Sequence, residues 1–215
     1  MNRTGPDPLP PLDTESIAIV VSACLLGEPV GYDGSSWPSE LVRRIAGHPR
    51  VRAVPFCPET HVLGVPRRWM SIHGGDGFAV LGGEARVINV DGEDLTDAFV
   101  AGAEALLALA REHDARLAIL TDISPMCGSS VIYRGEALPE RAYQPSSGVG
   151  AAAVRTAGIP VISQRDTASL ERLYAALDPG HVVDPEAKDF VSDPWYVQTF
   201  LEPAPESPEP VFEED

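Results

Sequence analysis

Residues 17–27, IAIVVSACLLG, form a run of apolar, mostly β-branched residues that leads into a cysteine. Such a run is typical of a strand buried on both faces, as in a parallel sheet. The same pattern occurs again at residues 51–57 (VRAVPFC) and 117–127 (LAILTDISPMC). The chain contains three cysteines, and each follows a strand of this kind. Since ligands bind outside the carboxyl ends of parallel strands, we predict that the three thiols meet at one site.

The segments between these runs favour helices. Apolar residues recur at helical spacing over residues 95–109, and a glycine-led segment, GVGAAAVRTAG, spans residues 148–158. We expect further helices from about residue 38 to residue 47 and through residues 170–177, and a fourth strand over residues 159–163. Strands that alternate with helices predict an α/β fold with a mostly parallel sheet and helices on both faces.

Two segments break this alternation. Residues 59–70 are interpreted as a loop, because Gly64 and Pro66 interrupt them. Residues 72–90 are rich in glycine and predict a small excursion of short β-strands rather than a helix. Asp94 is then a plausible N-cap for the long helix that follows.

The chain length fits one domain with tails. Residues 1–15 contain four prolines among polar residues and predict a disordered, unpacked arm. We expect a single α/β domain over residues 16–180 and a C-terminal extension over residues 181–201. Residues 202–215, EPAPESPEPVFEED, predict an acidic, proline-rich disordered tail.

The charge of the chain excludes some partners. The formal net charge is −16 and the sequence pI is about 4.6, so broad binding of nucleic acid is disfavoured. No stretch approaches the length of a membrane span, and no basic segment followed by an apolar core marks a secretory signal. We therefore expect a cytoplasmic protein that acts on a small molecule. The sequence leaves its oligomeric state open.

An odd number of cysteines argues against a purely disulfide framework. Three thiolates are soft ligands, suited to an iron–sulfur cluster or to zinc. A cubane cluster with three cysteine ligands leaves one iron free to act as a Lewis acid on a substrate. Two alternatives stay open. The cysteines could be small buried hydrophobes, or they could bind a structural zinc together with His61 or His73.

Six short motifs then narrow the interpretation. They are SACLLG (22–27), YDG (32–34), CPE (57–59), LGVPR (63–67), SPMCGSS (124–130) and IYRG (132–135). In this order, over about residues 17–163, they resemble the family that includes the TudS-type thiouracil desulfidases.

The resemblance implies a Rossmann-like α/β fold that carries a [4Fe-4S] cluster. By motif position, Cys24, Cys57 and Cys127 would bind the cluster, and the fourth iron would take the sulfur of a thiocarbonyl substrate. The resemblance also implies that Glu59 and Ser124 act near the cluster. Without the motifs, Glu59 would be interpreted as a solvated turn residue and Ser124 as the start of an ordinary Ser-Pro turn.

Three further residues are candidates for substrate binding. Asp33 could orient the edge of a uracil-like base, although Asp-Gly is also an ordinary turn pair. Arg67 could neutralise a phosphate, or it could be one of two exposed arginines with Arg68. Ser129 belongs to a Gly-Ser-Ser segment whose backbone N–H groups could surround the cluster or an anion.

The chain departs from the family at three places near the expected site. The stretch just before SPMCG, where the family usually has a basic residue, often as K-x-R, is TDI with Asp122; Met126 replaces a serine, and SSGVG replaces a segment that often contains Asp-Gly. These differences bear on the substrate more than on the cluster. We predict a non-redox desulfidase that releases sulfide from a thiolated base or nucleotide, with Glu59 as proton shuttle and Ser124 positioning the substrate. The alternative is a nucleotide-binding or sulfur-sensing module without catalysis.

Overall fold

A four-stranded parallel sheet forms the centre of the protein. The computed structural model describes residues 5–12, 15–133, 135 and 143–202. The strands lie in the order β2-β1-β5-β8. Their bounds are β1 Ile17–Ser22, β2 Val51–Phe56, β5 Leu117–Leu120 and β8 Val161–Ser163. The three cysteine-bearing runs therefore supply three neighbouring strands, β2, β1 and β5.

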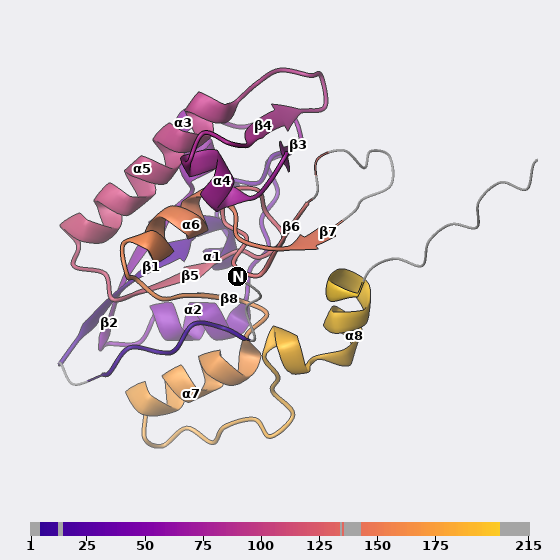
Figure 1. Ribbon diagram of the computed structural model, residues 1–215. Helices are drawn as coiled ribbons and strands as arrows, with labels where there is room; N and C mark the ends of the chain where they lie inside the picture. Colours follow the sequence, from indigo (N-terminus) through magenta and orange to yellow (C-terminus); the bar gives the residue numbers. More distant parts are fainter. Residues whose placement is uncertain (1–4, 13–14, 134, 136–142, 203–215) are drawn as a thin grey trace, which may run out of the picture.

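Helices cover both faces of this sheet, as predicted (Figure 1). Alternate residues of β1 point to opposite sides: Ala18 and Val20 pack into one core cluster, and Ile17, Ile19 and Val21 into the other. The first cluster is covered by α5 (Thr96–Glu112) and α6 (Val149–Thr156), and the second by α2 (Glu40–Ala46) and α7 (Thr167–Leu177). The strand β1 is therefore buried on both faces, as predicted, whereas the edge strand β2 is partly exposed.

Smaller elements complete the fold around the sheet. Two antiparallel pairs, β3–β4 and β6–β7, extend beyond it. The remaining bounds are α1 Ala23–Leu26, α3 Pro58–Leu63, β3 Met70–His73, α4 Gly77–Leu81, β4 Arg86–Asn89, β6 Val131–Tyr133, β7 Tyr143–Pro145, η1 Phe190–Ser192, α8 Pro194–Tyr196 and the π-helical turn η2 Val197–Leu201. The pair β3–β4 confirms the predicted excursion, with α4 inserted where only strands were expected.

The predicted loop over residues 59–70 is wrong in its first half. Pro58 starts α3, and Cys57 caps this helix by accepting a hydrogen bond from the backbone N–H of Thr60 at 3.4 Å. Proline is favoured in a first helical turn because its missing N–H is not needed there. The helix ends before Gly64, whose φ of +74° suits a residue without a side chain.

Two helix starts also differ from the predictions. The helix expected near residue 38 begins at Glu40, because the Ser39 hydroxyl accepts from the backbone N–H of Val42. Asp94 does not occupy the N-cap position of α5, which is Leu95. Its carboxylate instead accepts from the backbone N–H and the hydroxyl of Thr96, which tightens the turn before the helix.

The N-terminal segment is packed rather than unpacked over residues 5–12. The Asp7 carboxylate is buried, 2.8 Å from Nε of Arg155, and accepts from the backbone N–H of Val161. Leu9 and Leu12 pack against the second core cluster. A short proline-rich segment is thereby fixed by one buried arginine of α6. The predicted C-terminal tail lies outside the described residues, apart from Glu202.

No helix among the described residues is long and apolar enough to cross a membrane.

Candidate functional site

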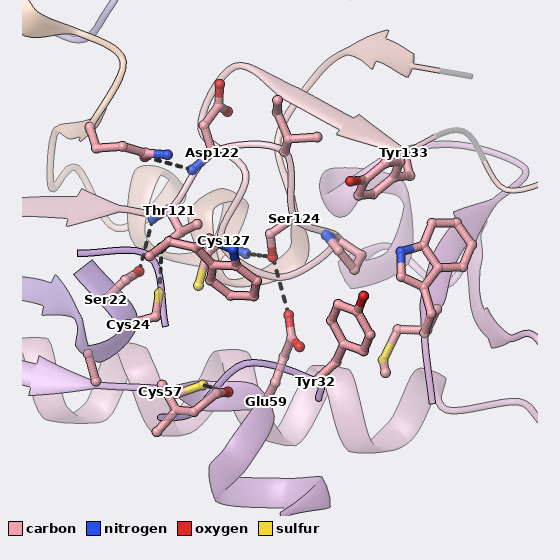
Figure 2. A pocket seen from close by; sticks show the side chains of 18 of the residues that line it. Ser22, Cys24, Tyr32, Cys57, Glu59, Thr121, Asp122, Ser124, Cys127 and Tyr133 are labelled. Carbon is pink, nitrogen blue, oxygen red and sulfur yellow. Dashed lines mark hydrogen bonds between the residues drawn. The ribbon is translucent and has the colours of Figure 1, made fainter. Parts of the chain in front are cut away.

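A cavity of about 420 Å³ opens at the carboxyl ends of β1, β2 and β5. Cys24, Cys57 and Cys127 all line it, together with Glu59 and Ser124. In the view of Figure 2, Ser124 and Glu59 lie between the three cysteines on one side and Tyr133 on the other. The predicted convergence of three strand ends on one site is therefore present in the fold.

Cys24 lies in the first turn after β1 and faces the end of β5. Its Sγ is 2.8 Å from the hydroxyl of Thr121, and the backbone N–H of Thr121 donates to the Ser22 hydroxyl at 3.0 Å. Burial raises the pKa of the Cys24 thiol to about 11, although the Thr121 hydroxyl opposes this shift. Without a metal, this thiol is protonated at neutral pH.

Cys57 is held at the N-terminus of α3. Its Sγ accepts from both the backbone N–H and the hydroxyl of Thr60, at 3.4 and 3.2 Å. The thiol also lies 3.7 Å from the carbonyl oxygen of Val30. These contacts fix the position of the Cys57 sulfur at the cavity wall.

Cys127 lies in a tight turn after β5. The Ser124 hydroxyl accepts from the backbone N–H groups of Met126 and Cys127, at 3.1 and 3.0 Å. The next residue must be glycine, because a Cβ at Gly128 would lie 2.5 Å from the carbonyl oxygens of Ser124 and Val131. Burial, followed by the nearby charges of Cys57 and Glu59, raises the pKa of Cys127 well above its usual value.

The turn that carries Ser124 is strained. Ile123 has a φ of +57°, which is unfavourable for a β-branched residue. Strain of this kind persists only where surrounding contacts enforce it, and it is common at functional sites. Here the backbone N–H groups after the turn are held by Ser124 and, further on, by the Asp122 carboxylate, which accepts from Ser130 and Val131.

The three thiols fit a cluster better than a single ion. All three are unpaired. A tetrahedral zinc needs each sulfur about 2.3 Å from one metal. In residues 5–12, 15–133, 135 and 143–202, no three His, Cys, Asp or Glu side chains are grouped to hold one ion. A cubane instead gives each thiolate its own iron, so its ligands stand around a cage.

The histidines proposed for a zinc site lie elsewhere. His61 packs against the ring of Phe56, with centroids 5.4 Å apart, and His73 contacts the hydroxyl of Ser71. Neither histidine lines the cavity. The arrangement also disfavours scattered cysteines that only fill the core, since all three line a single cavity. Among the alternatives, a cluster suits this donor set best.

Glu59 and Ser124 are in direct contact, although they are 65 residues apart. The Ser124 hydroxyl donates to Oε1 of Glu59 at 3.2 Å, drawn as a dashed line in Figure 2. Oε2 of the same carboxylate accepts two bonds from Arg67, at 2.9 and 2.7 Å. The Glu59 and Arg67 side chains are only 13% and 7% exposed. The carboxylate is therefore fixed in direction at the cavity wall.

Arg67 lines the cavity, but its guanidinium is already occupied. Besides Glu59, it donates to the carbonyl oxygens of Val30 and Gly64 and to the hydroxyl of Thr60. The prediction of an exposed arginine pair fails for Arg67, because these acceptors enclose it. It holds for Arg68, which is exposed and bonded to Asp91. Arg67 is thus placed to orient Glu59 rather than to receive an anion.

Asp33 and Ser129 do not line the cavity. Asp33 is exposed, and its Oδ1 accepts from the backbone N–H of Ser35 at 2.9 Å, as in an ordinary turn. The hydrogen bonds to Ser35 hold the pKa of Asp33 below its usual value. Ser129 is buried, with its hydroxyl 3.2 Å from that of Ser130. Both residues support loops next to the site.

A row of aromatic rings forms another wall of the cavity; of these rings, the sequence alone suggests only Trp69 as a residue that could stack on a base. The ring centroids of Trp69 and Tyr133 are 5.0 Å apart, those of Tyr133 and Tyr143 5.4 Å, and those of Tyr143 and Phe200 4.7 Å. All four rings line the cavity. They come from four separate segments, so no local pattern in the sequence could have joined them. Such a wall suits a planar ring, because offset and edge-on aromatic contacts are favourable.

Comparisons with known proteins agree with this geometry. The 2-thiouracil desulfurase family model matches residues 19–166. The uncharacterized protein YbbK of Bacillus subtilis (strain 168) is 40% identical over 151 residues, which is 69% of this chain and 96% of YbbK. The solved structure of the [4Fe-4S]-dependent thiouracil desulfidase TudS is 34% identical, with a TM-score of 0.61, over 77% of this chain and 99% of that one. This chain belongs to the 2-thiouracil desulfurase family.

Proposed function

We propose that this protein is a desulfidase that removes sulfur from a thiolated pyrimidine base or nucleotide as sulfide, with a [4Fe-4S] cluster bound by Cys24, Cys57 and Cys127. One observation carries the proposal. Three unpaired thiols from three segments line a cavity whose wall also holds the hydrogen-bonded pair of Glu59 and Ser124. The solved relative is itself named a [4Fe-4S]-dependent thiouracil desulfidase, which supports the same class of activity here.

The reaction replaces sulfur by oxygen at one carbon: a thiocarbonyl and water give a carbonyl and hydrogen sulfide, with no net redox change. When bound, the cluster supplies an iron without a protein ligand, a Lewis acid for the thiocarbonyl sulfur. The protein must then deliver water and move protons. Oε1 of Glu59 faces the cavity beside the Ser124 hydroxyl and is the proton acceptor for the attacking water.

Ser124 and Arg67 prepare the carboxylate for this role. Arg67 occupies Oε2 of Glu59 with two hydrogen bonds, so Oε1 is left to exchange protons. The Ser124 hydroxyl donates to Oε1 and also caps the turn that carries Cys127. We assign Glu59 as the catalytic proton shuttle and Ser124 as the group that positions substrate and carboxylate together. Arg67 is a positioning residue, which revises its predicted contact with substrate.

The walls of the cavity favour an uncharged, planar ring. Trp69, Tyr133, Tyr143 and Phe200 supply apolar surface and π-faces opposite the thiols. A thiolated pyrimidine matches this surface through its ring and the cluster through its sulfur.

Anaerobic purification, with reconstitution where needed, tests the cluster. We expect a brown protein with about four irons and about four sulfides per chain. Sulfide release is then measured with 2-thiouracil, 4-thiouracil and 4-thiouridine monophosphate. Serine variants of Cys24, Cys57 and Cys127 should each lower the iron content and abolish release. A colourless protein after reconstitution, with wild-type iron content no higher than that of the serine variants, rejects the proposal.

The same assay separates the non-catalytic alternative. A sensing or binding module would retain about four irons and show no sulfide release above that of the serine variants. Glu59→Gln is the matched control for catalysis, because it keeps the length and polarity of the side chain but cannot accept a proton. We expect Glu59→Gln to bind iron normally and to lose activity.

A further inference from the structure

The aromatic wall of the cavity ends in a residue from the far C-terminus. Phe200 lies in the turn η2, and its ring meets that of Tyr143 edge-on, at an interplanar angle of 87°. It lines the same cavity as the three cysteines, and the side chain is 8% exposed. Residues 189–201, here called the C-terminal segment, therefore contribute one side of the candidate active site.

The C-terminal segment is fixed to the domain by specific polar contacts. The Tyr196 hydroxyl donates to the Asp122 carboxylate, which lies directly after β5. The backbone N–H of Phe190 donates to Asp166, and Asp189 accepts from both the backbone N–H and the hydroxyl of Ser169. A segment held by buried hydrogen bonds of this kind positions its side chains reproducibly.

Apolar packing supports the same placement. Phe190, Tyr196 and Phe200 form a third core cluster together with Val131 of β6, and Tyr143 of β7 packs against it. The Phe200 ring also contacts those of Tyr196 and Trp195, at centroid distances of 4.8 and 5.5 Å. The Phe200 ring therefore packs between its own segment and the β6–β7 pair. Another rotamer of Phe200 would disrupt the third core cluster.

Asp122 connects this arrangement to the departure seen in the sequence. Asp122 lies in the stretch just before SPMCG, and its carboxylate accepts a hydrogen bond from the Tyr196 hydroxyl. The family match ends at residue 166, so the segment that supplies Tyr196 and Phe200 lies beyond it. A residue within the region matched by the family and a segment beyond that region therefore meet in one hydrogen bond.

We infer that Phe200 is a specificity-determining residue: it contacts the ring of the thiolated base and limits that base to a single six-membered ring. The inference rests on the proposed function, which supplies the substrate. Tyr196 is the positioning residue that holds Phe200 in place through Asp122. A base stacked on or against an aromatic side chain loses about 10-fold or more in affinity when that side chain is removed.

The test uses the intact, cluster-loaded chain under anaerobic conditions. For Phe200→Ala we expect KM for 2-thiouracil to rise about 10-fold, with kcat changed less than about twofold. The larger cavity should also admit a two-ring substrate, so the preference for 2-thiouracil over 6-mercaptopurine should fall about fivefold or more. Phe200→Leu, which retains bulk but not the ring, should keep the size preference and raise KM.

Two further variants control for indirect effects. Gln198→Ala changes an exposed residue of the same turn and should leave KM and the size preference unchanged. Tyr196→Phe loses only the hydroxyl that donates to Asp122. It should raise KM in the same direction as Phe200→Ala, by a smaller factor, with kcat unchanged.

A binding measurement separates this inference from the proposed function. Calorimetric titration with uracil, the desulfurised ring, reports the contact without catalysis. If wild type releases sulfide but Phe200→Ala and Phe200→Leu match it in KM, size preference and uracil affinity, the inference is wrong and the function stands. If wild type releases no sulfide but binds uracil about 10-fold more tightly than Phe200→Ala, the ring contact stands and the function is wrong. If Phe200→Ala does not fold, Phe200→Leu provides the test. A KM and a uracil affinity equal to those of wild type would then show that the inference is wrong.

Discussion

The hydroxyl of Ser124 donates to Oε1 of Glu59 at 3.2 Å, and this one bond joins the turn after β5 to the helix after β2. The same hydroxyl accepts from the backbone N–H of Cys127. A proton-transfer residue and a predicted cluster ligand are therefore fixed by a single side chain. Substitution of Ser124 should therefore affect the positions of both Glu59 and Cys127.

Glu59→Gln should lower kcat for sulfide release about 100-fold or more, since general acid–base groups contribute factors of about 10² to 10⁴. Its iron content should equal that of wild type. Ser124→Ala should lower kcat about 10-fold or more, and Ser124→Thr, which keeps a hydroxyl, should recover much of it. Iron analysis and steady-state rates check both expectations. Full activity in Glu59→Gln would contradict the role of the carboxylate.

Arg67→Lys should reduce kcat with little change in KM, because lysine cannot reproduce the two hydrogen bonds that fix Oε2 of Glu59. If Arg67 bound a substrate phosphate, its substitution would instead raise KM for the nucleotide and leave KM for the free base unchanged. Kinetics with 4-thiouracil and 4-thiouridine monophosphate distinguish the two patterns. Arg68→Lys changes an arginine of an exposed pair with Asp91 and is the matched control. It should leave kcat and KM unchanged.

Asp7 and Arg155 form a buried ion pair between the N-terminal segment and α6. Burial lowers the pKa of Arg155 to about 10, yet it remains charged at neutral pH. Asp7→Asn or Arg155→Met alone should lower the free energy of unfolding by about 3–5 kcal/mol, because each removes the ion-pair partner of a buried charge. The double variant, Asp7→Asn with Arg155→Met, should lower the free energy of unfolding by clearly less than the sum of the two single effects.

Urea unfolding measures all three variants. The exposed pair of Arg68 and Asp91, 64% and 54% accessible, provides the comparison: Arg68→Ala should leave the free energy of unfolding nearly unchanged. Additive costs for Asp7 and Arg155 would show that the two side chains act independently.

Asp166 should make the protein less stable as pH rises through 6. Burial raises the pKa of this carboxyl from 3.8 to about 6, against the hydrogen bonds from Ser163 and Phe190. The native state thus binds its proton more tightly than the unfolded state does. Stability supplied by the protonated form is complete below pH 3.8 and is lost as pH rises through about 6.

Relative to Asp166→Asn, wild type should lose about 2 kcal/mol of unfolding free energy between about pH 4.5 and pH 7.5. Urea unfolding of both proteins at several pH values checks this difference, and the subtraction removes carboxyl groups that the two share. A difference that stays constant, or that favours wild type at high pH, would contradict the sign.

Much of the architecture was readable from local patterns. The apolar runs before Cys24, Cys57 and Cys127 predicted three strands and their common edge, because a buried strand needs a continuous apolar stretch. The motifs identified Glu59 and Ser124 as neighbours of that edge. What failed were features decided by distant partners: Asp7 is ordered by Arg155, and Arg67 is enclosed by the carbonyl oxygens of Val30 and Gly64.

The aromatic wall could not be predicted for the same reason. Trp69, Tyr133, Tyr143 and Phe200 meet only after β3, β6, β7 and η2 are in place. Each ring alone is an ordinary core residue in the sequence. Likewise, Asp122 appeared only as a departure from the family until Tyr196 was found to donate to it.

The order of strands has a consequence for how the protein matures. The thiols of Cys24, Cys57 and Cys127 follow β1, β2 and β5, so they come together only when these three strands have paired side by side. No short peptide of this chain can present the full set of sulfur donors. The set of three sulfur donors is therefore complete only after the sheet has assembled, and a nascent chain that ends before residue 127 carries only two of the three.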